Sequence, residues 1–240
     1  MISAEDLDKK EIRFNNICYD DFYPDNLNSN LIYSLYKSND GLLWVGTIGS
    51  GVNFFDPNQK KFQHYKLNYG DGSLLSNFIR SVYADEAGMI WLGTHNNGLF
   101  LLDRTRESFK KLGFDTQSIF YIEHYQGNKF FVCSSRGLYL IEYSQGEVNL
   151  LSSLIMNACF DVEQSKENTY WLASLLGMKQ FTVINDQLVI DGDFNVNSQP
   201  AISFNNCRVL FYDQDKNELL IGTEGGGLNI ASLDEAHNLI

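Results

Sequence analysis

The residues that could carry catalysis or hold a metal are few in this sequence, and their spacing fits neither task. The cysteines form no Cys-x-x-Cys pair, and no histidines stand at the spacing of a zinc site. The nucleophile-elbow, zinc-protease and Walker A motifs are absent. The glycine-rich "EGGGLN" at 224–229 precedes no predicted helix, whose dipole a phosphate site would use. We therefore expect no catalytic residue, no metal and no cofactor, and we expect buried thiols in strands at Cys18, Cys133, Cys159 and Cys207.

The charge of the chain restricts the partners that it can have. Eighteen Lys and Arg against 30 Asp and Glu give a net charge of −12, which repels phosphate backbones and anionic lipid headgroups. No segment approaches the roughly 20 apolar residues that span a bilayer, and the acidic start "MISAEDLDKK" lacks the pattern of a signal peptide. We expect no nucleic acid and no direct membrane insertion, and a neutral or cationic ligand fits the charge best.

An internal repeat organises the sequence. The segment "WVGT" at 44 returns as "WLGT" at 91, "FVCS" at 131, "WLAS" at 171 and "LIGT" at 220. Each copy has a bulky apolar anchor residue, then an aliphatic, a small and a hydroxyl residue. The spacings of 47, 40, 40 and 49 residues fit a repeat of one supersecondary unit.

The register of the repeat extends to both sides of the anchor. An apolar residue stands nine positions upstream, and a residue type that tolerates a turn with positive φ stands three positions upstream. We expect structural roles for the anchors, for a side-chain amide 14 residues upstream and for a downstream glycine. These residues are Trp44, Trp91, Phe131 and Trp171; Asn30, Asn77, Gln117, Asn157 and Asn206; and Gly51, Gly98, Gly137, Gly177 and Gly227.

Each copy predicts about four short strands and no helix, because apolar or alternating runs are separated by turn residues. Four-stranded antiparallel sheets repeated at this spacing indicate an all-β fold, a β-propeller with about five blades present. We expect a polar extension at 1–11, an outer strand at 12–20 and blades at 27–67, 74–112, 115–150, 155–190 and 203–233. The chain is then part of a larger, seven-bladed ring, or else the outer strand at 12–20 completes the last blade of a closed five-bladed ring.

The positions that change between copies are the candidates for binding. The loop after each "GT" reads "IGS", "HNN", "SR", "LL" and "EGG", and it lies on the ring face where loops of several blades converge. Hydrogen-bonding side chains in these loops, together with two residues of inner strands, are the predicted ligand-binding residues: His95, Asn96, Asn97, Arg136, Glu224, Tyr33 and Arg80.

The first two copies, "NLIYSLYKSNDGLLWVGTIGSGVNFFD" and "NFIRSVYADEAGMIWLGTHNNGLFLLD", resemble the two-component regulator propeller repeat. The fifth copy keeps "LIGTEGGGLNIAS", while the third and fourth are degenerate. Proteins of this family are periplasmic sensor regions of hybrid two-component histidine kinases in Bacteroidetes. The resemblance implies a non-enzymatic module of a membrane-anchored sensor that detects products of polysaccharide breakdown and controls glycan-utilisation genes.

The partners implied are an oligosaccharide, the remaining sensor domains or a second copy of the chain. Two other functions stay open. A protein-interaction scaffold would show a large apolar patch on one ring face. A propeller lyase would need a histidine and an acid or metal converging at the channel mouth. An open set of blades would also expose the two faces at its ends.

Overall fold

The computed structural model describes residues 17–19, 26–56, 61–65, 74–103, 108–114, 117–236 and 238–239. The predicted extension at 1–11 lies outside these residues. Of the predicted outer strand at 12–20, only residues 17–19 are described, and they lie in no strand.

The described residues form five antiparallel sheets in which each strand pairs with its neighbour in the chain. The first sheet contains β1 (Ile32–Lys37), β2 (Leu43–Thr47), β3 (Val52–Asp56) and β4 (Lys61–Tyr65). The second contains β5 (Ile79–Ala84), β6 (Ile90–Thr94), β7 (Leu99–Asp103) and β8 (Ser108–Gly113). The third contains β9 (Ile119–Gln126), β10 (Lys129–Ser134), β11 (Gly137–Ser144) and β12 (Glu147–Ile155). The fourth contains β13 (Cys159–Lys166), β14 (Thr169–Ser174), β15 (Gly177–Ile184) and β16 (Gln187–Phe194), and the fifth β17 (Cys207–Asp213), β18 (Glu218–Thr223) and β19 (Gly227–Ser232).

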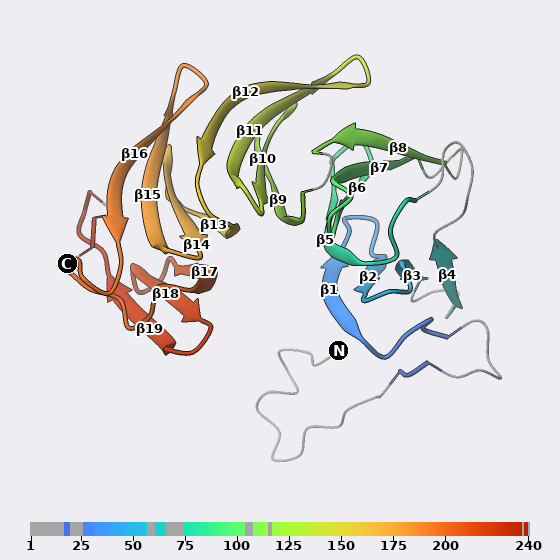
Figure 1. Ribbon diagram of the computed structural model, residues 1–240, viewed down its shortest axis with the longest axis horizontal. Helices are drawn as coiled ribbons and strands as arrows, with labels where there is room; N and C mark the ends of the chain where they lie inside the picture. The colour runs from blue at the N-terminus through green and yellow to red at the C-terminus, as the bar shows by residue number, and fades with distance from the viewer. Residues whose placement is uncertain are drawn as a thin grey trace.

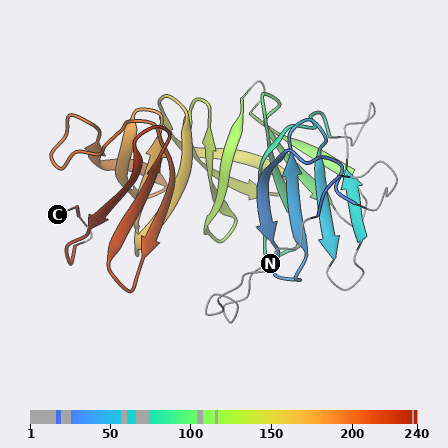
Figure 2. The ribbon, with the colours of Figure 1, turned by 90° about the horizontal axis from the view of Figure 1, so that it is seen from below.

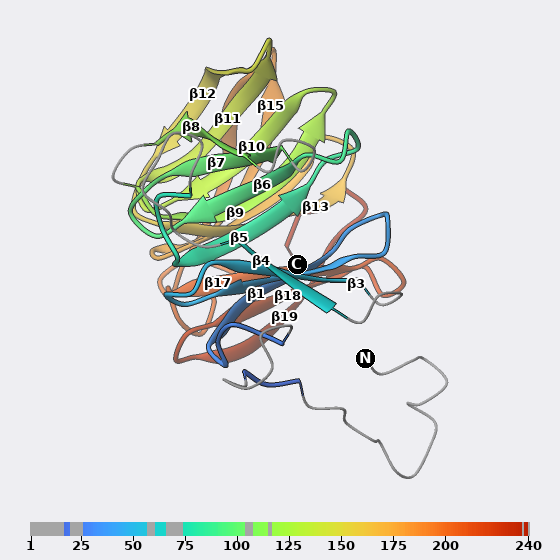
Figure 3. The ribbon, with the colours of Figure 1, turned by 90° about the vertical axis from the view of Figure 1, so that its right-hand side faces the viewer.

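The predicted all-β propeller of four-stranded blades is confirmed, with three strands in the fifth blade among the described residues. The five sheets follow one another around a common centre, and their first strands, β1, β5, β9, β13 and β17, lie innermost (Figure 1). Figure 3 shows the second sheet in front of the third, so that neighbouring sheets meet face to face.

The arc of sheets is open. The first and fifth sheets stand at its two ends (Figure 1), and Figure 2 shows them apart, with the middle sheets visible between them. The described residues therefore do not form the closed five-bladed ring that the sequence left open as an alternative.

Four hydrophobic cores lie between neighbouring blades, and the repeat anchors fill them. Trp44, Trp91, Phe131 and Trp171 are at most 1% exposed, and each packs against the blade that follows its own. A second apolar residue joins each core from the segment that precedes the inner strand of the following blade: Leu74, Phe114, Leu154 and Ile202. The apolar faces that a single sheet would leave wet are thus buried between blades.

The two end faces of the arc lack a neighbouring blade, although Leu27 packs on Val45 of the first blade and both are buried. Leu35 is 65% exposed, whereas the residues at its repeat position in the next three blades are half-buried or buried in inter-blade cores. On the fifth blade, Phe211, Leu228 and Ile230 are about 60% exposed on the face that would meet a following blade. The expected exposure of both ends of an open set of blades is therefore confirmed for the described residues.

One apolar position of the repeat has a different role in the fifth copy. Phe211 pairs with the anchor Leu220, whereas Val162 pairs with Leu172, one residue beyond the anchor of its blade. The β17–β18 hairpin is one residue longer, and a one-residue shift turns a side chain to the other face of a strand. Leu210, not Phe211, therefore packs against the fourth blade.

The predicted turn residues are found in positive-φ conformations at Gly41, Gly88, Asn168 and Asn217, while Gly127 takes this role in place of Asn128. Of the cysteines, Cys133, Cys159 and Cys207 are buried as expected. Cys18 is exposed, so its predicted burial in a strand is wrong.

Replacing either of two glycines with similar φ angles by alanine is expected to destabilise the protein, but to different extents. Gly88 has φ +77° with nothing within 4 Å of an added Cβ, whereas at Gly98, with φ +81°, a Cβ would collide with the carbonyl oxygen of Gly113. We expect Gly88→Ala to lower the free energy of unfolding by about 1 kcal/mol and Gly98→Ala by about 3 kcal/mol. Urea unfolding of both variants measures the difference, and equal losses would contradict the clash.

Candidate functional site

A β-bulge marks the inner strand of every blade. In each blade the pairing of the inner strand with the next strand shifts its register near the start of the inner strand, where one residue is left outside the ladder, and blades 3 and 4 have a second shift near the hairpin. These five bulge residues are Tyr33, Arg80, Phe120, Phe160 and Arg208. A bulge bends its strand and redirects a side chain, and bulges are frequent beside binding sites.

The bulge residues occupy one position of the repeat. They stand 11 residues before the anchor in the first four copies and 12 in the fifth, where the hairpin is one residue longer. The inner strands surround the centre of the arc (Figure 1), and this position lies at the start of each of them.

The five side chains contact one another in blade order. The guanidinium carbon of Arg80 lies 4.9 Å from the ring centre of Tyr33 and 4.9 Å from that of Phe120. The Phe120 and Phe160 rings meet edge to face at 5.0 Å, and the guanidinium carbon of Arg208 lies 3.9 Å from the centre of the Phe160 ring. We call this continuous row of aromatic and cationic groups the bulge ribbon.

The loop after β6 supports the ribbon at Arg80. The Arg80 Nε donates to His95 Nδ1 at 3.2 Å, and an Nη donates to the Tyr33 hydroxyl. Because a guanidinium only donates, Nδ1 must be the acceptor, so His95 is neutral with its proton on Nε2. Burial and the nearby Arg80 charge lower the pKa of His95, which agrees with the neutral form.

Further bonds fix the same loop. The Ser118 hydroxyl lies 2.9 Å from His95 Nδ1 and donates to Asn96 Oδ1 at 3.0 Å. The Phe78 ring packs 4.8 Å from the imidazole of His95. His95 and Asn96 thus sit at the blade 2–blade 3 junction, directly beside the ribbon.

At the other end of the ribbon, Arg208 is neutralised by its own blade. It forms a salt bridge with Glu224, which also accepts a hydrogen bond from Asn206 Nδ2 at 3.1 Å. Glu224 therefore orients Arg208 against Phe160.

Of the predicted ligand-binding residues, the structure brings Tyr33, Arg80, His95 and Asn96 together and places Glu224 beside Arg208. Asn97 donates to the carbonyl of His95 within its own loop. Arg136 is exposed in the turn between β10 and β11, and no contact joins it to the ribbon among the described residues.

Sequence reasoning did not find Phe120, Phe160 and Arg208. The sequence feature that could have identified them is a position of the repeat, on the inner strand, whose residue type changes from copy to copy. It was hidden because the third and fourth copies are degenerate and the fifth is shifted by one residue.

The hydroxyl residues that end each repeat anchor segment, and the repeated amides and glycines, make bonds within and between blades. The hydroxyls of Thr47, Thr94, Ser174 and Thr223 donate to the carbonyl of the glycine that opens the next strand, at 2.6–2.8 Å. The Ser134 hydroxyl donates instead to Gln117 Oε1 at 2.8 Å. The backbone carbonyls of two of the repeated amides accept from the glycine of the preceding blade: Asn77 from Gly51 and Gln117 from Gly98.

Two carboxylates of β13 bond to the backbone of the inner strand of the fifth blade. Asp161 Oδ2 accepts from the backbone N–H of Leu210 at 2.7 Å, and Glu163 Oε1 accepts from that of Tyr212 at 2.9 Å. Burial raises the pKa of Asp161 to about 7, helped by the charges of Glu163 and Glu123. These two acids join the fourth blade to the inner strand of the fifth.

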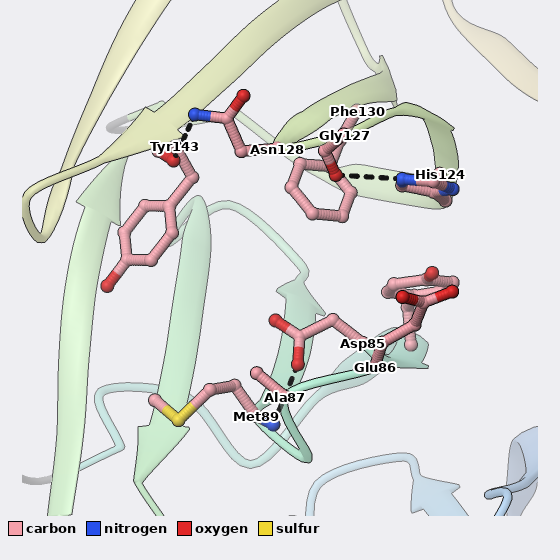
Figure 4. Close-up of a pocket in the computed structure, with 10 residues that line it drawn as sticks. Asp85, Glu86, Ala87, Met89, His124, Gly127, Asn128, Phe130 and Tyr143 are labelled. Carbon is pink, nitrogen blue, oxygen red and sulfur yellow. Dashed lines mark hydrogen bonds between the residues drawn. The ribbon is translucent and has the colours of Figure 1, made fainter.

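A separate cavity of about 280 Å³ lies between blades 2 and 3, at the turns that end the inner strands. Its polar groups are already bonded to one another: Asp85 accepts from the N–H of Met89, Asn128 donates to the carbonyl of Tyr143, and His124 bonds the carbonyl of Gly127 (Figure 4). Asp85 also accepts from Trp91 Nε1 at 2.9 Å. These groups stabilise the blade turns, whereas the ribbon presents aromatic faces and N–H donors on the channel.

Within the described residues, no group of three or more His, Cys, Asp or Glu side chains is placed to hold a metal ion. The described part of the chain also contains no helix whose length and hydropathy would let it cross a bilayer.

Among solved structures, the chain is similar in fold to three propellers. The extracellular domain described as a hybrid two-component system from B. thetaiotaomicron aligns with a TM-score of 0.74 and 24% identity, over 90% of this chain and 28% of its own length. PorZ of the type-IX secretion system of Porphyromonas gingivalis aligns with a TM-score of 0.65 and 16% identity, over 90% of this chain and 34% of its own. The Cps50 (Swd1) propeller of Myceliophteria thermophila aligns with a TM-score of 0.61 and 11% identity, over 88% and 68%.

This chain thus spans about a third or less of the length of the first two of these proteins. No curated protein matches the chain. Two segments, residues 26–49 and 73–96, match the family model of the two component regulator propeller, and they coincide with the first two copies of the repeat. The chain is therefore a β-propeller in whose first two blades the segments that contain the two inner strands match the two component regulator propeller model.

Proposed function

We propose that the chain is a non-enzymatic, ligand-sensing propeller module from the extracytoplasmic part of a membrane-anchored hybrid two-component system. Its ligand is an oligosaccharide released from a polysaccharide, and its site is the bulge ribbon. In this role the protein is periplasmic and controls the use of the glycan that it detects.

The bulge ribbon carries this proposal. Aromatic faces such as Phe120 and Phe160 suit the apolar faces of sugar rings, and guanidinium and imidazole N–H groups suit their hydroxyls. The ribbon has no nucleophile with an activating base. Among the residues that the structure describes, His95 accepts a hydrogen bond from Arg80 and is not paired with an acid. These features favour binding over catalysis, and therefore disfavour a lyase.

The end faces of the arc would serve assembly. Leu35 on the first blade and Phe211, Leu228 and Ile230 on the fifth occupy positions that face a neighbouring blade. The remaining sensor domains, which would complete a seven-bladed ring, or a second copy of the chain would pack on these faces.

Loss of one ribbon ring is expected to weaken oligosaccharide binding. Phe120→Ala and Phe160→Ala each remove a stacking face, which predicts about a tenfold loss of affinity. Calorimetry of the 240-residue chain with neutral tetrasaccharides of glucose, xylose and mannose and with trigalacturonate measures the effect.

The matched control is Leu150→Ala on the outer strand β12, where the side chain is 59% exposed and far from the inner strands. It should leave affinity unchanged. If the chain binds no oligosaccharide, or if Phe120→Ala and Phe160→Ala bind as the parent chain does, the site is not the bulge ribbon.

A protein-interaction scaffold is the second candidate, and one observation favours it. The turn between β14 and β15 exposes two adjacent leucines, Leu175 at 40% and Leu176 at 54%, on the same ring face as the ribbon. Under this alternative, Leu176→Ser would weaken binding of a protein partner and leave oligosaccharide binding intact.

A further inference from the structure

Arg80 is held in the middle of the ribbon between aromatic rings. Its guanidinium carbon lies 4.9 Å from the ring centre of Tyr33, 5.0 Å from that of Phe78 and 4.9 Å from that of Phe120. Cation–π contacts of this kind stabilise a guanidinium in place without neutralising it. The group is therefore fixed in direction but keeps its full charge.

In the part of the chain that the structure describes, no carboxylate balances that charge. Among the described residues Arg80 has no salt bridge, whereas Arg208 is paired with Glu224. Burial and the charge of Arg208 lower the pKa of Arg80, which shows that its charged form is held at an energetic cost. A half-buried cation without a counter-ion creates a favourable position for an anion.

The remaining hydrogen-bonding capacity of Arg80 points the same way. Its contacts with His95 and Tyr33 use two of the five N–H groups of a guanidinium. Among the described residues no hydrogen bond uses Nη2, and a guanidinium edge binds a carboxylate through two parallel bonds.

We infer that the bulge ribbon binds an acidic oligosaccharide, with the carboxylate of a uronic acid unit on Arg80 and its sugar rings along Phe120 and Phe160. The inference rests on the proposed function and names the class of its ligand. It differs from the expectation of a neutral or cationic ligand, which follows from the net charge of −12. Net charge governs approach from a distance, whereas the groups within a site decide what binds there.

Trigalacturonate and its fully methyl-esterified form test the charge, since they differ only in their carboxylates. Calorimetry at physiological ionic strength is expected to show that the parent chain binds the acid at least tenfold more tightly than the ester. Arg80→Gln should lower affinity for the acid at least tenfold more than it lowers affinity for the ester. Lys166→Gln, an equal charge change at the far end of β13, should change neither by more than threefold.

A second measurement needs no variant. A carboxylate bound at Arg80 lies close to the imidazole of His95 and raises its pKa. Titration followed by NMR of the His95 ring should show this rise with trigalacturonate and no rise with the ester.

Equal affinity of the parent chain for acid and ester, no binding of either, or equal loss of both in Arg80→Gln would overturn the inference. An unchanged pKa of His95 on binding the acid would overturn it as well. If the parent chain binds neutral tetrasaccharides and Phe120→Ala weakens that binding, the proposed function is still supported. Failure of this inference can therefore be distinguished from failure of the proposed function.

Discussion

Asp161→Asn is expected to stabilise the protein at pH 8 by roughly 2–4 kcal/mol, given about three pKa units at 1.36 kcal/mol each. Burial raises the pKa of Asp161 from 3.8 to about 7, so between these values the folded protein holds a proton that the unfolded chain has released. The free energy of unfolding therefore falls as the pH rises from about 4 to about 7. Asparagine keeps an oxygen acceptor for the Leu210 N–H without the buried charge.

Urea unfolding of the parent chain and the variant at pH 5 and pH 8 checks this expectation. The advantage of Asp161→Asn should be larger at pH 8 than at pH 5. Asp191→Asn, which removes an exposed carboxylate from β16, controls for the lower self-repulsion of a chain with a charge of −12. An advantage that is the same at both pH values would show that the Asp161 carboxylate is not desolvated.

Trp171→Ala is expected to lower the free energy of unfolding by about 3–5 kcal/mol, the usual cost of truncating a buried aromatic residue. The Trp171 side chain is fully buried between blades 4 and 5, donates from Nε1 to the Ser165 hydroxyl at 3.0 Å and packs against Phe194. The variant would lose all three contributions at once.

Leu220→Ala is the matched control, because Leu220 is the anchor of the fifth copy but is only partly buried on the uncovered end face. Its loss should stay below about 1 kcal/mol. Chemical denaturation of both variants measures the pair of values. A loss at Leu220 comparable to that at Trp171 would mean that this end face is covered in solution.

Much of the fold could be predicted from the sequence because it depends on local pattern. Short alternating runs between turn residues indicated strands, and the glycines and asparagines of the hairpins were found with positive φ. The anchors indicated the filling of the blade interfaces, and four of the five are buried there. The outcome for Phe211 shows the limit of counting positions, since one extra hairpin residue moved it to the opposite face.

The candidate site could be predicted only in part. Residues close in the chain to the anchors, such as His95 and Asn96, were found because their loop changes between copies. Phe120, Phe160 and Arg208 were not found, because a bulge is visible only in the pairing of two strands. The ribbon also requires contacts between residues about 40 positions apart, which no local pattern contains.

The sequence by itself determined the repeat and the four-stranded blade, because these follow from side-chain periodicity and turn chemistry, and its first two copies showed the resemblance that the family model matches. Only the tertiary structure decided which repeated residues are buried, since an identical position is core between two blades and solvent-exposed at an end of the arc. It also decided the ligand-binding candidate. Five bulges turn one variable side chain per blade toward a shared centre, and the uncompensated charge of Arg80 arises only where those side chains meet.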